Sequence, residues 1–156
     1  MIMRIIEAND EHVNKAGKLV SRCFPYRSFL ERMSFWAYKN KHKRWIKKMM
    51  KWIGILDIVN IWVAVDESNN VWGTIGLYSC VEDYTNSIWL FWFCVDPSVR
   101  GHGIGKRLLE LSISSGKKMG KRYLRLYTSN LIEESIAQNL YNCVGLNVVK
   151  EERKIF

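Results

Sequence analysis

Residues 88–107 read IWLFWFCVDPSVRGHGIGKR, a segment in which an apolar run, alternate glycines and a helical pattern follow one another. Its first part, Ile88–Val95, is apolar almost throughout and rich in aromatic side chains, as expected of a central strand covered on both faces. Pro97 ends that strand. Beyond the glycines, apolar residues recur at helical spacing from Ile104 to Ser115. The stretch therefore predicts a buried strand, a glycine-rich turn and an amphipathic helix in direct succession.

The turn carries glycine at alternate positions, Gly101, Gly103 and Gly105. Glycines leave backbone N–H groups uncovered at the start of a helix, where unpaired donors and the helix dipole favour an anion such as phosphate. The arginine and lysine that flank these glycines add positive charge. A dinucleotide fingerprint needs two residues between its second and third glycines, and a Walker A loop needs Ser or Thr where Arg107 stands. The spacing therefore excludes both of these phosphate loops.

The rest of the chain alternates helical and strand patterns without an internal repeat or a linker. Besides 88–95, strands are expected over residues 3–7, 58–65, 71–79, 122–128 and 146–155. The first helix is expected to begin at a cap, Asn9 or Asp10, and to end at Pro25. Further helices are expected over residues 28–52, with a break near Asn40, and over 104–115 and 133–143. Asp66–Asn70 has the turn residues of a hairpin. The order β-α-α-β-β-β-α-β-α-β predicts a mixed α/β sheet with helices on both faces, in one domain over residues 1–156.

The composition is that of a globular protein, with 48% hydrophobic and 25% charged residues, which excludes intrinsic disorder and fibrous architectures. The net charge of +9 is concentrated in one segment that has no acid between Glu31 and Asp57. Its basic residues are Lys39, Lys41, Lys43, Arg44, Lys47, Lys48 and Lys51. Such a block is either a solvated helix face or a surface that attracts nucleic acid, an anionic membrane or an acidic substrate.

The cysteines are scattered and lie in apolar surroundings, which predicts buried free thiols and no metal site. They are Cys23, Cys80, Cys94 and Cys143. The longest apolar runs are far short of the roughly 20 residues that span a bilayer, and Met1–Asp10 has no signal-peptide pattern. We therefore expect a cytoplasmic protein without a membrane partner.

Two stretches resemble the signatures of the GNAT superfamily of N-acetyltransferases. VDPSVRGHGIGKRLLE, residues 95–110, is similar to the strand, V-x-P-x-x-R/Q-G-x-G-x-G/A loop and helix of that family, and AQNLYNCVGL, residues 137–146, is similar to its second signature. The resemblance implies a mostly antiparallel sheet with splayed central strands. It also implies transfer of an acetyl group from acetyl-coenzyme A, without a metal, to a primary amine of a small molecule or peptide by direct attack.

The resemblance assigns roles to particular residues. Backbone groups of Phe93, Cys94 and Val95 would pair with the pantetheine arm, and the Val95 N–H would serve as the oxyanion donor. Tyr141 stands at the position of the general acid. The pyrophosphate would be wrapped by a loop made of Arg100, Gly101, His102, Gly103, Ile104, Gly105 and Lys106.

Two positions depart from the family pattern. Glu134 stands where members commonly carry Asn, and Leu146 replaces the usual Phe after Gly145. The predicted strand 88–95 carries no acid that could act as a general base, which leaves Glu82, Asp83, Glu133, Glu134 or a water chain.

The main alternative is a non-catalytic module that binds acyl-coenzyme A and engages nucleic acid or a protein through the basic 39–51 face. Nucleic acid stays open as a partner without being favoured. The chain is expected to be a monomer or a homodimer.

Overall fold

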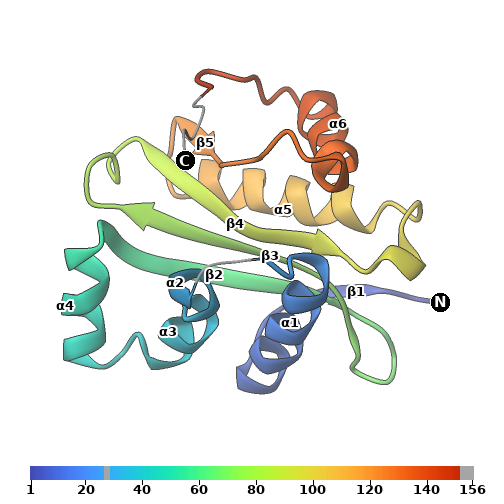
Figure 1. The fold of residues 1–156 in the computed structure, drawn as a ribbon, viewed down its shortest axis with the longest axis horizontal. Coiled ribbons are helices and arrows are strands. Elements are labelled where there is room, and N and C mark those ends of the chain that lie inside the picture. The colour runs from blue at the N-terminus through green and yellow to red at the C-terminus, as the bar shows by residue number, and fades with distance from the viewer. Residues whose placement is uncertain (27–28, 152–156) are drawn as a thin grey trace.

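The computed structural model describes residues 1–26 and 29–151 and has an open five-stranded sheet between two layers of helices (Figure 1). Neighbouring strands run antiparallel except β4 and β5, which are parallel. In their order across the sheet the strands are β1 (Arg4–Glu7), β2 (Ile55–Val65), β3 (Val71–Cys80), β4 (Ser87–Val95) and β5 (Tyr123–Arg125). The mixed, mostly antiparallel α/β sheet expected from the sequence is confirmed.

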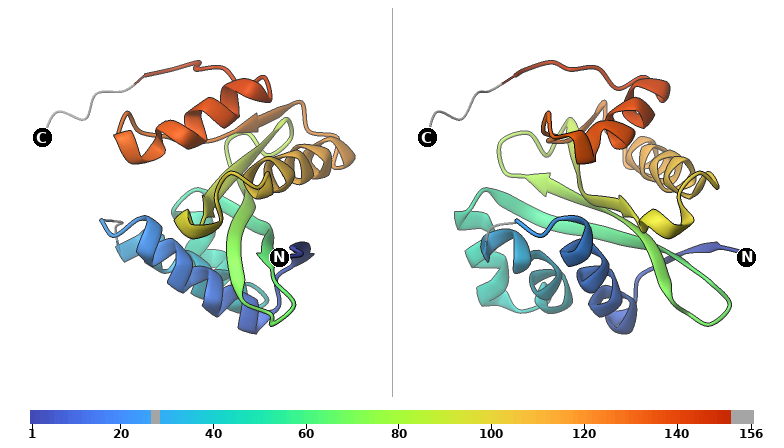
Figure 2. Two further views of the ribbon diagram at one scale, coloured as in Figure 1. Left: turned by 90° about the vertical axis from the view of Figure 1, so that its right-hand side faces the viewer. Right: turned by 45° about the vertical axis from the view of Figure 1, so that its right-hand side comes forward.

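Helices cover both faces of the sheet, α1 to α4 on one side and α5 with α6 on the other (Figure 2). They are α1 (Asp10–Cys23), α2 (Phe29–Arg32), α3 (Ser34–Asn40), α4 (Arg44–Trp52), α5 (Ile104–Lys118) and α6 (Ser135–Cys143), with short 3-10 turns η1 (Pro97–Val99) and η2 (Ile132–Glu134). Within the described residues, no helix is both long and apolar enough to cross a lipid bilayer.

Alternation along β2 divides the apolar side chains between two cores. Ile61 and Val63 pack with α1 residues such as Leu19. Trp62 and Ala64 face the other way and pack with α5 residues, among them Leu108 and Leu109. The β2, β3 and β4 strands are therefore buried on both faces, which is why Ile88–Val95 is so apolar.

A bulge interrupts β4 near its middle. Gly76 pairs with Phe91 and Thr74 with Cys94, so β4 has one more residue than β3 between these pairs. Trp92 has a φ of +46°, an unusual value for a bulky residue. Gly76 makes room here, because a Cβ at this position would lie 2.2 Å from the Phe91 ring. Since β5 pairs with β4 only over Ser87–Trp89, the bulged half of β4 leaves its outer edge unpaired with β5.

The predicted elements differ from the structure in three places. Residues 146–151 of the expected final strand have no regular secondary structure, and 152–155 lie outside the described residues. The strand expected over 122–128 is only three residues long. Its edge is therefore too short to pair with the ten-residue strand that was expected over 146–155. The helical region expected over 28–52, whose first residue is not described, is divided into α2, α3 and α4, with the expected break after Asn40.

The expectation of buried thiols holds for Cys94 only. Cys23 and Cys80 are partly exposed, and Cys143 is exposed. Cys143 ends α6, a helix that lies over the sheet without any fully buried residue, so an apolar sequence neighbourhood did not produce burial there.

Candidate active site

The loop between β4 and α5 begins at Asp96, whose carboxylate is held on two sides. It accepts hydrogen bonds from the N–H and hydroxyl of Ser98 at 3.0 and 2.7 Å, and it pairs with Arg22 of α1 at 2.9 Å. The Ser98 hydroxyl and N–H, together with Arg22, lower the pKa of Asp96 below its usual value. These contacts attach the start of the loop to the end of α1.

Gly101 and Gly103 adopt left-handed backbone conformations, with φ of +84° and +77°. A Cβ at either position would meet nothing within 4 Å, so backbone conformation is what requires glycine there. Gly103 is the N-cap of α5 and has no side chain to bond the first-turn N–H groups. These donors, with the positive end of the helix dipole, form a site suited to an anion.

Gly105 has a different reason to be glycine. Its Cβ would lie 3.3 Å from Leu140 of α6 and 3.4 Å from the Phe93 ring of β4. The first turn of α5 is therefore packed closely against both β4 and α6. This close packing brings the donors of the α5 N-terminus next to the end of β4.

Two basic side chains of the loop bond to backbone carbonyls. The Arg100 Nε donates to the Val95 carbonyl at 3.0 Å. The His102 Nδ1 lies 3.1 Å from the carbonyls of Val99 and Arg100, and since carbonyls only accept, this nitrogen carries the proton. His102 thus supports the shape of the loop, while Lys106 stays exposed and pairs loosely with Glu110 at 3.8 Å.

The end of β4 directs backbone groups away from β3. The Asp96 N–H donates to the Trp72 carbonyl of β3 at 2.8 Å. Because hydrogen-bonding direction alternates along a strand, Val95 and Phe93 turn their N–H and C=O groups to the opposite edge, and Cys94 turns its own toward β3. The bond from Arg100 to the Val95 carbonyl agrees with this direction. The outward edge is the one that β5 leaves uncovered beyond Trp89.

Tyr141 lies on α6 beside this edge. Its ring centroid is 5.9 Å from that of Phe93, and its side chain belongs to the core between α5 and the sheet. Burial, with smaller contributions from Glu134 and Cys94, raises the pKa of Tyr141 above its usual value. The phenol therefore keeps its proton at neutral pH and can act as a donor.

Two of the carboxylates considered as general bases, Glu134 and Asp83, have structural partners. Glu134 accepts hydrogen bonds from the Thr128 hydroxyl at 2.6 Å and the Ser129 N–H at 2.7 Å, which fastens the loop after β5 to η2. Asp83 accepts from the Trp89 indole at 3.1 Å. The structure therefore uses these carboxylates to hold loops.

Cys94 is not available as a nucleophile. Its thiol lies in the core with that of Cys23, and the hydrogen bond between them lowers the pKa of Cys23 to about 7 and raises that of Cys94. A protonated buried thiol is a poor nucleophile.

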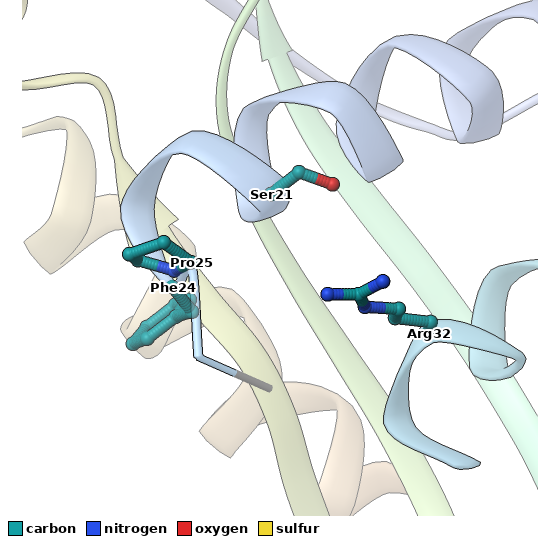
Figure 3. Close-up of a pocket in the computed structure, with 4 residues that line it drawn as sticks. All are labelled: Ser21, Phe24, Pro25 and Arg32. Carbon is teal, nitrogen blue, oxygen red and sulfur yellow. The ribbon is translucent and has the colours of Figure 1, made fainter. Parts of the chain in front are cut away.

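A cavity of about 360 Å³ opens between the end of α1 and α2. It is lined by Ser21, Phe24, Pro25 and Arg32, and Figure 3 shows the Arg32 guanidinium extending into it. Phe24 also packs against Trp92 of the β4 bulge, with ring centroids 5.8 Å apart. No sequence pattern predicts this hollow, because its walls come from two segments, the end of α1 and α2, that share no motif.

A family model described as an acetyltransferase (GNAT) domain matches residues 57–145, which include most of β2, all of β3 to β5 and the loop described above. This match covers more than half of the chain. The chain belongs to the GNAT acetyltransferases. Among curated proteins, none matches the sequence of this GNAT chain significantly.

Solved structures of other acetyltransferases share the fold of this GNAT protein. A GNAT-family acetyltransferase from Staphylococcus aureus Mu50 superposes with a TM-score of 0.68 at 21% identity, over 92% of this chain and 82% of that one. An aminoglycoside N-acetyltransferase in complex with coenzyme A has a TM-score of 0.62 at 19% identity, and the match covers 99% of this chain and 93% of that one. Glucosamine-6-phosphate N-acetyltransferase from Arabidopsis thaliana has a TM-score of 0.65 at 17% identity, and the match covers 100% of this chain and 99% of that one.

Proposed function

We propose that this GNAT chain is an acetyl-coenzyme A-dependent N-acetyltransferase that acts on the primary amine of a small molecule or peptide. One observation carries the proposal: the outward backbone of Val95 and the uncapped first turn of α5 lie together beside the uncovered edge of β4. Coenzyme A has an amide-bearing arm and a pyrophosphate. A strand edge suits the first, and a helix N-terminus suits the second.

The residues of this chain divide the binding of the cosubstrate between them. Phe93 would pair its outward N–H and C=O with the pantetheine arm, and Val95 its outward C=O, which leaves the Val95 N–H for the thioester. The loop from Arg100 to Lys106 would hold the pyrophosphate through backbone N–H groups, with the exposed Lys106 adding charge. Arg100, which bonds the Val95 carbonyl, would be released or would share that oxygen when the arm pairs, since a carbonyl has two acceptor positions.

The chemistry needs an oxyanion donor and a proton donor. Acetyl-coenzyme A supplies the acetyl group as a thioester. The Val95 N–H would donate a hydrogen bond to the carbonyl oxygen of the thioester as negative charge develops on it. Such a donor lowers the activation free energy by roughly 3 kcal/mol. The Tyr141 hydroxyl would give its proton to the departing thiolate, whose conjugate acid has a pKa near 8.5. Because Glu134 and Asp83 hold loops through hydrogen bonds, we propose a water chain, rather than either of these two carboxylates, as the acceptor of the proton that the incoming ammonium loses.

The cavity lined by Phe24 and Arg32 is the proposed entry for the acceptor, since Phe24 reaches the β4 bulge. Two of the similar structures are enzymes named for aminoglycosides and for glucosamine 6-phosphate, which both carry primary amines. These two compounds therefore belong in the first acceptor panel. The free cysteines fit a reducing compartment, and we propose the cytoplasm as the location.

The test combines calorimetric binding of acetyl-coenzyme A with release of free coenzyme A thiol in the presence of amines, amino sugars and peptides. Saturable binding with amine-dependent thiol release is expected. Binding without release from any acceptor would instead support a non-catalytic acyl-coenzyme A module. Absence of binding would overturn the proposal altogether.

A further inference from the structure

The α4 helix and the residue before it present a cluster of exposed cations. They are Lys43, Arg44, Lys47, Lys48 and Lys51. Among the described side chains, the ion pairs are Lys15–Glu11, Arg22–Asp96, Lys106–Glu110 and Arg125–Asp83, and none of them uses a cation of this cluster. The local charge is therefore not neutralised by those pairs.

Large apolar side chains are exposed beside these cations. Trp45 is 57% exposed, Trp52 is 87% exposed and Ile53 is 42% exposed. Trp45 and Trp52 are seven residues apart and so lie on the same side of α4, while Ile46 and Met50 on the opposite side are fully buried. Trp36 of α3 extends the apolar strip, with its ring centroid 5.8 Å from that of Trp45.

We name this region the Trp–Lys surface; it comprises Trp36, Trp45, Trp52 and Ile53 with Lys43, Arg44, Lys47, Lys48 and Lys51. In Figure 1, α4 lies at the opposite end of the long axis from the start of α5. Its cations are therefore too distant to neutralise a pyrophosphate at the α5 N-terminus. Lys41, by contrast, donates hydrogen bonds to the Ile58 and Val59 carbonyls and so attaches the end of α3 to β2. Binding of the cosubstrate thus does not explain the Trp–Lys surface.

We propose that the Trp–Lys surface docks this protein on the surface of a bilayer that contains anionic phospholipid, which replaces the expectation of no membrane partner. Indole rings favour the boundary between headgroups and acyl chains, and lysines beside them are attracted to anionic headgroups. The binding of an interfacial helix strengthens with the apolar area that it buries and with its electrostatic attraction to anionic lipid, and this surface offers both. The start of α5 then faces away from the membrane and remains open to soluble substrates.

The ring geometry favours a bilayer over single-stranded nucleic acid. Stacked bases need aromatic faces that lie flat and open, whereas the rings of Trp36 and Trp45 are tilted by 54° against each other. Ile53 adds an aliphatic side chain, which inserts among acyl chains but offers no ring to a base. A second copy of the chain would bring two like-charged surfaces together, which opposes self-association through this region.

Vesicle sedimentation tests the proposal with the full chain. We expect binding to phosphatidylcholine vesicles that contain phosphatidylserine, little binding to phosphatidylcholine alone, and weakening as salt rises. The double substitution Lys47→Gln, Lys48→Gln should lower the partition coefficient about 30-fold. The matched control Lys117→Gln, Lys118→Gln removes the same charge from the end of α5 and should change binding less than threefold. Trp52→Ser should weaken binding without altering the salt dependence.

Three outcomes would overturn the proposal: no binding to the mixed vesicles, equal loss in the two double variants, or binding to a single-stranded RNA oligonucleotide in place of vesicles. Thermal melts of all variants, which alter exposed side chains, should match that of the unaltered chain. Thiol release with a soluble acceptor should also be unchanged in the Lys47, Lys48 variant. Membrane docking and acetyl transfer can therefore fail independently.

Discussion

Tyr141 combines two properties that a proton donor to a leaving thiolate needs. It lies against Phe93 at the outward edge of β4, and its phenol is protonated at neutral pH. Burial raises the pKa of Tyr141, which makes the hydroxyl a weaker acid in the empty site, so transfer of its proton depends on the negative charge that develops on the sulfur. We expect Tyr141→Phe to lower kcat about 100-fold while the affinity for coenzyme A changes little, because only the hydroxyl is removed. Steady-state thiol release and calorimetry measure the two quantities separately.

The ring contact with Phe93 provides the control for that substitution. Phe preserves the ring and so the packing, whereas Tyr141→Ala removes both and should also lower the melting temperature. Full turnover in the Tyr141→Phe variant would exclude this hydroxyl from the mechanism.

Thr74 is a second residue whose hydroxyl has a measurable consequence. It is fully buried on β3 opposite Cys94, and its Oγ1 is the buried side-chain oxygen that lacks a hydrogen-bond partner among the described residues. Burying an unsatisfied hydroxyl is costly, and Val has nearly the same shape. We expect Thr74→Val to raise the free energy of unfolding by about 1 kcal/mol in urea titrations.

Thr128 offers the matched comparison, because its hydroxyl donates to Glu134. Thr128→Val should therefore leave stability unchanged or reduce it. A loss of stability in Thr74→Val would mean that its hydroxyl is satisfied in solution.

At the scale of elements, the loop into α5 depends on glycine backbone conformations. Gly103→Trp places a bulky side chain on a left-handed residue at the anion site, and should abolish coenzyme A binding in calorimetry. Gly120→Trp is the matched control, since Gly120 has a φ of +71° and nothing within 4 Å of its Cβ position, but lies after the other end of α5. Equal loss of affinity in both variants would contradict the assignment of the loop.

The hairpin between β2 and β3 depends on one carboxylate. Asp66 accepts from the Trp72 indole at 2.8 Å and from the Asn70 N–H and side-chain amide at 2.9 and 3.0 Å. The Trp72 bond first, and the Asn70 bonds next, lower the pKa of Asp66 to about 2. Because its unfolded pKa is near 3.9, Asp66 stabilises the fold above that pH, and this stabilisation is lost as pH falls through about 2.

We therefore expect the stability difference between the unaltered chain and Asp66→Asn to shrink as pH is lowered from about 5 to about 2. Urea midpoints measured across this range give the difference directly. A constant difference across the range would show that Asp66 does not contribute through its charge.

At the scale of the whole molecule, the proposed cosubstrate site joins β4, α5 and α6, so occupancy should stabilise the fold as a unit. Coenzyme A at about 100 times its dissociation constant adds about 2.7 kcal/mol to the free energy of unfolding. For a chain of this size that corresponds to a rise in Tm of about 5–10 °C, measurable by scanning fluorimetry. The Gly103→Trp variant should show no rise, and a rise equal to that of the unaltered chain would contradict the proposed site.

The arrangement of a sheet between two layers of helices was predictable, because local sequence patterns indicate its strands and helices. The continuous apolar run at 88–95 indicates a strand buried on both faces, and the helical spacing in 104–115 selects the face of that helix that is buried; both patterns are local. The register at the β4 bulge was not predictable, because Trp92 takes its positive φ only when Gly76 lets Phe91 approach. The hydrogen bonds of Glu134 were likewise not predictable, because their donors lie in the loop that follows β5.

The strand, the glycine loop and the helix of the proposed anion site follow from the amino-acid sequence, since glycine conformations and helix donors are properties of the local backbone. The sequence also determined the family and the position of Tyr141 in its second signature. Only the tertiary structure decided that Val95 turns its backbone outward, that Arg100 bonds its carbonyl and that 146–151 forms no strand. It alone also brought the tryptophans of α3 and α4 together beside the lysines. These features depend on register and packing between distant segments, which no local pattern specifies.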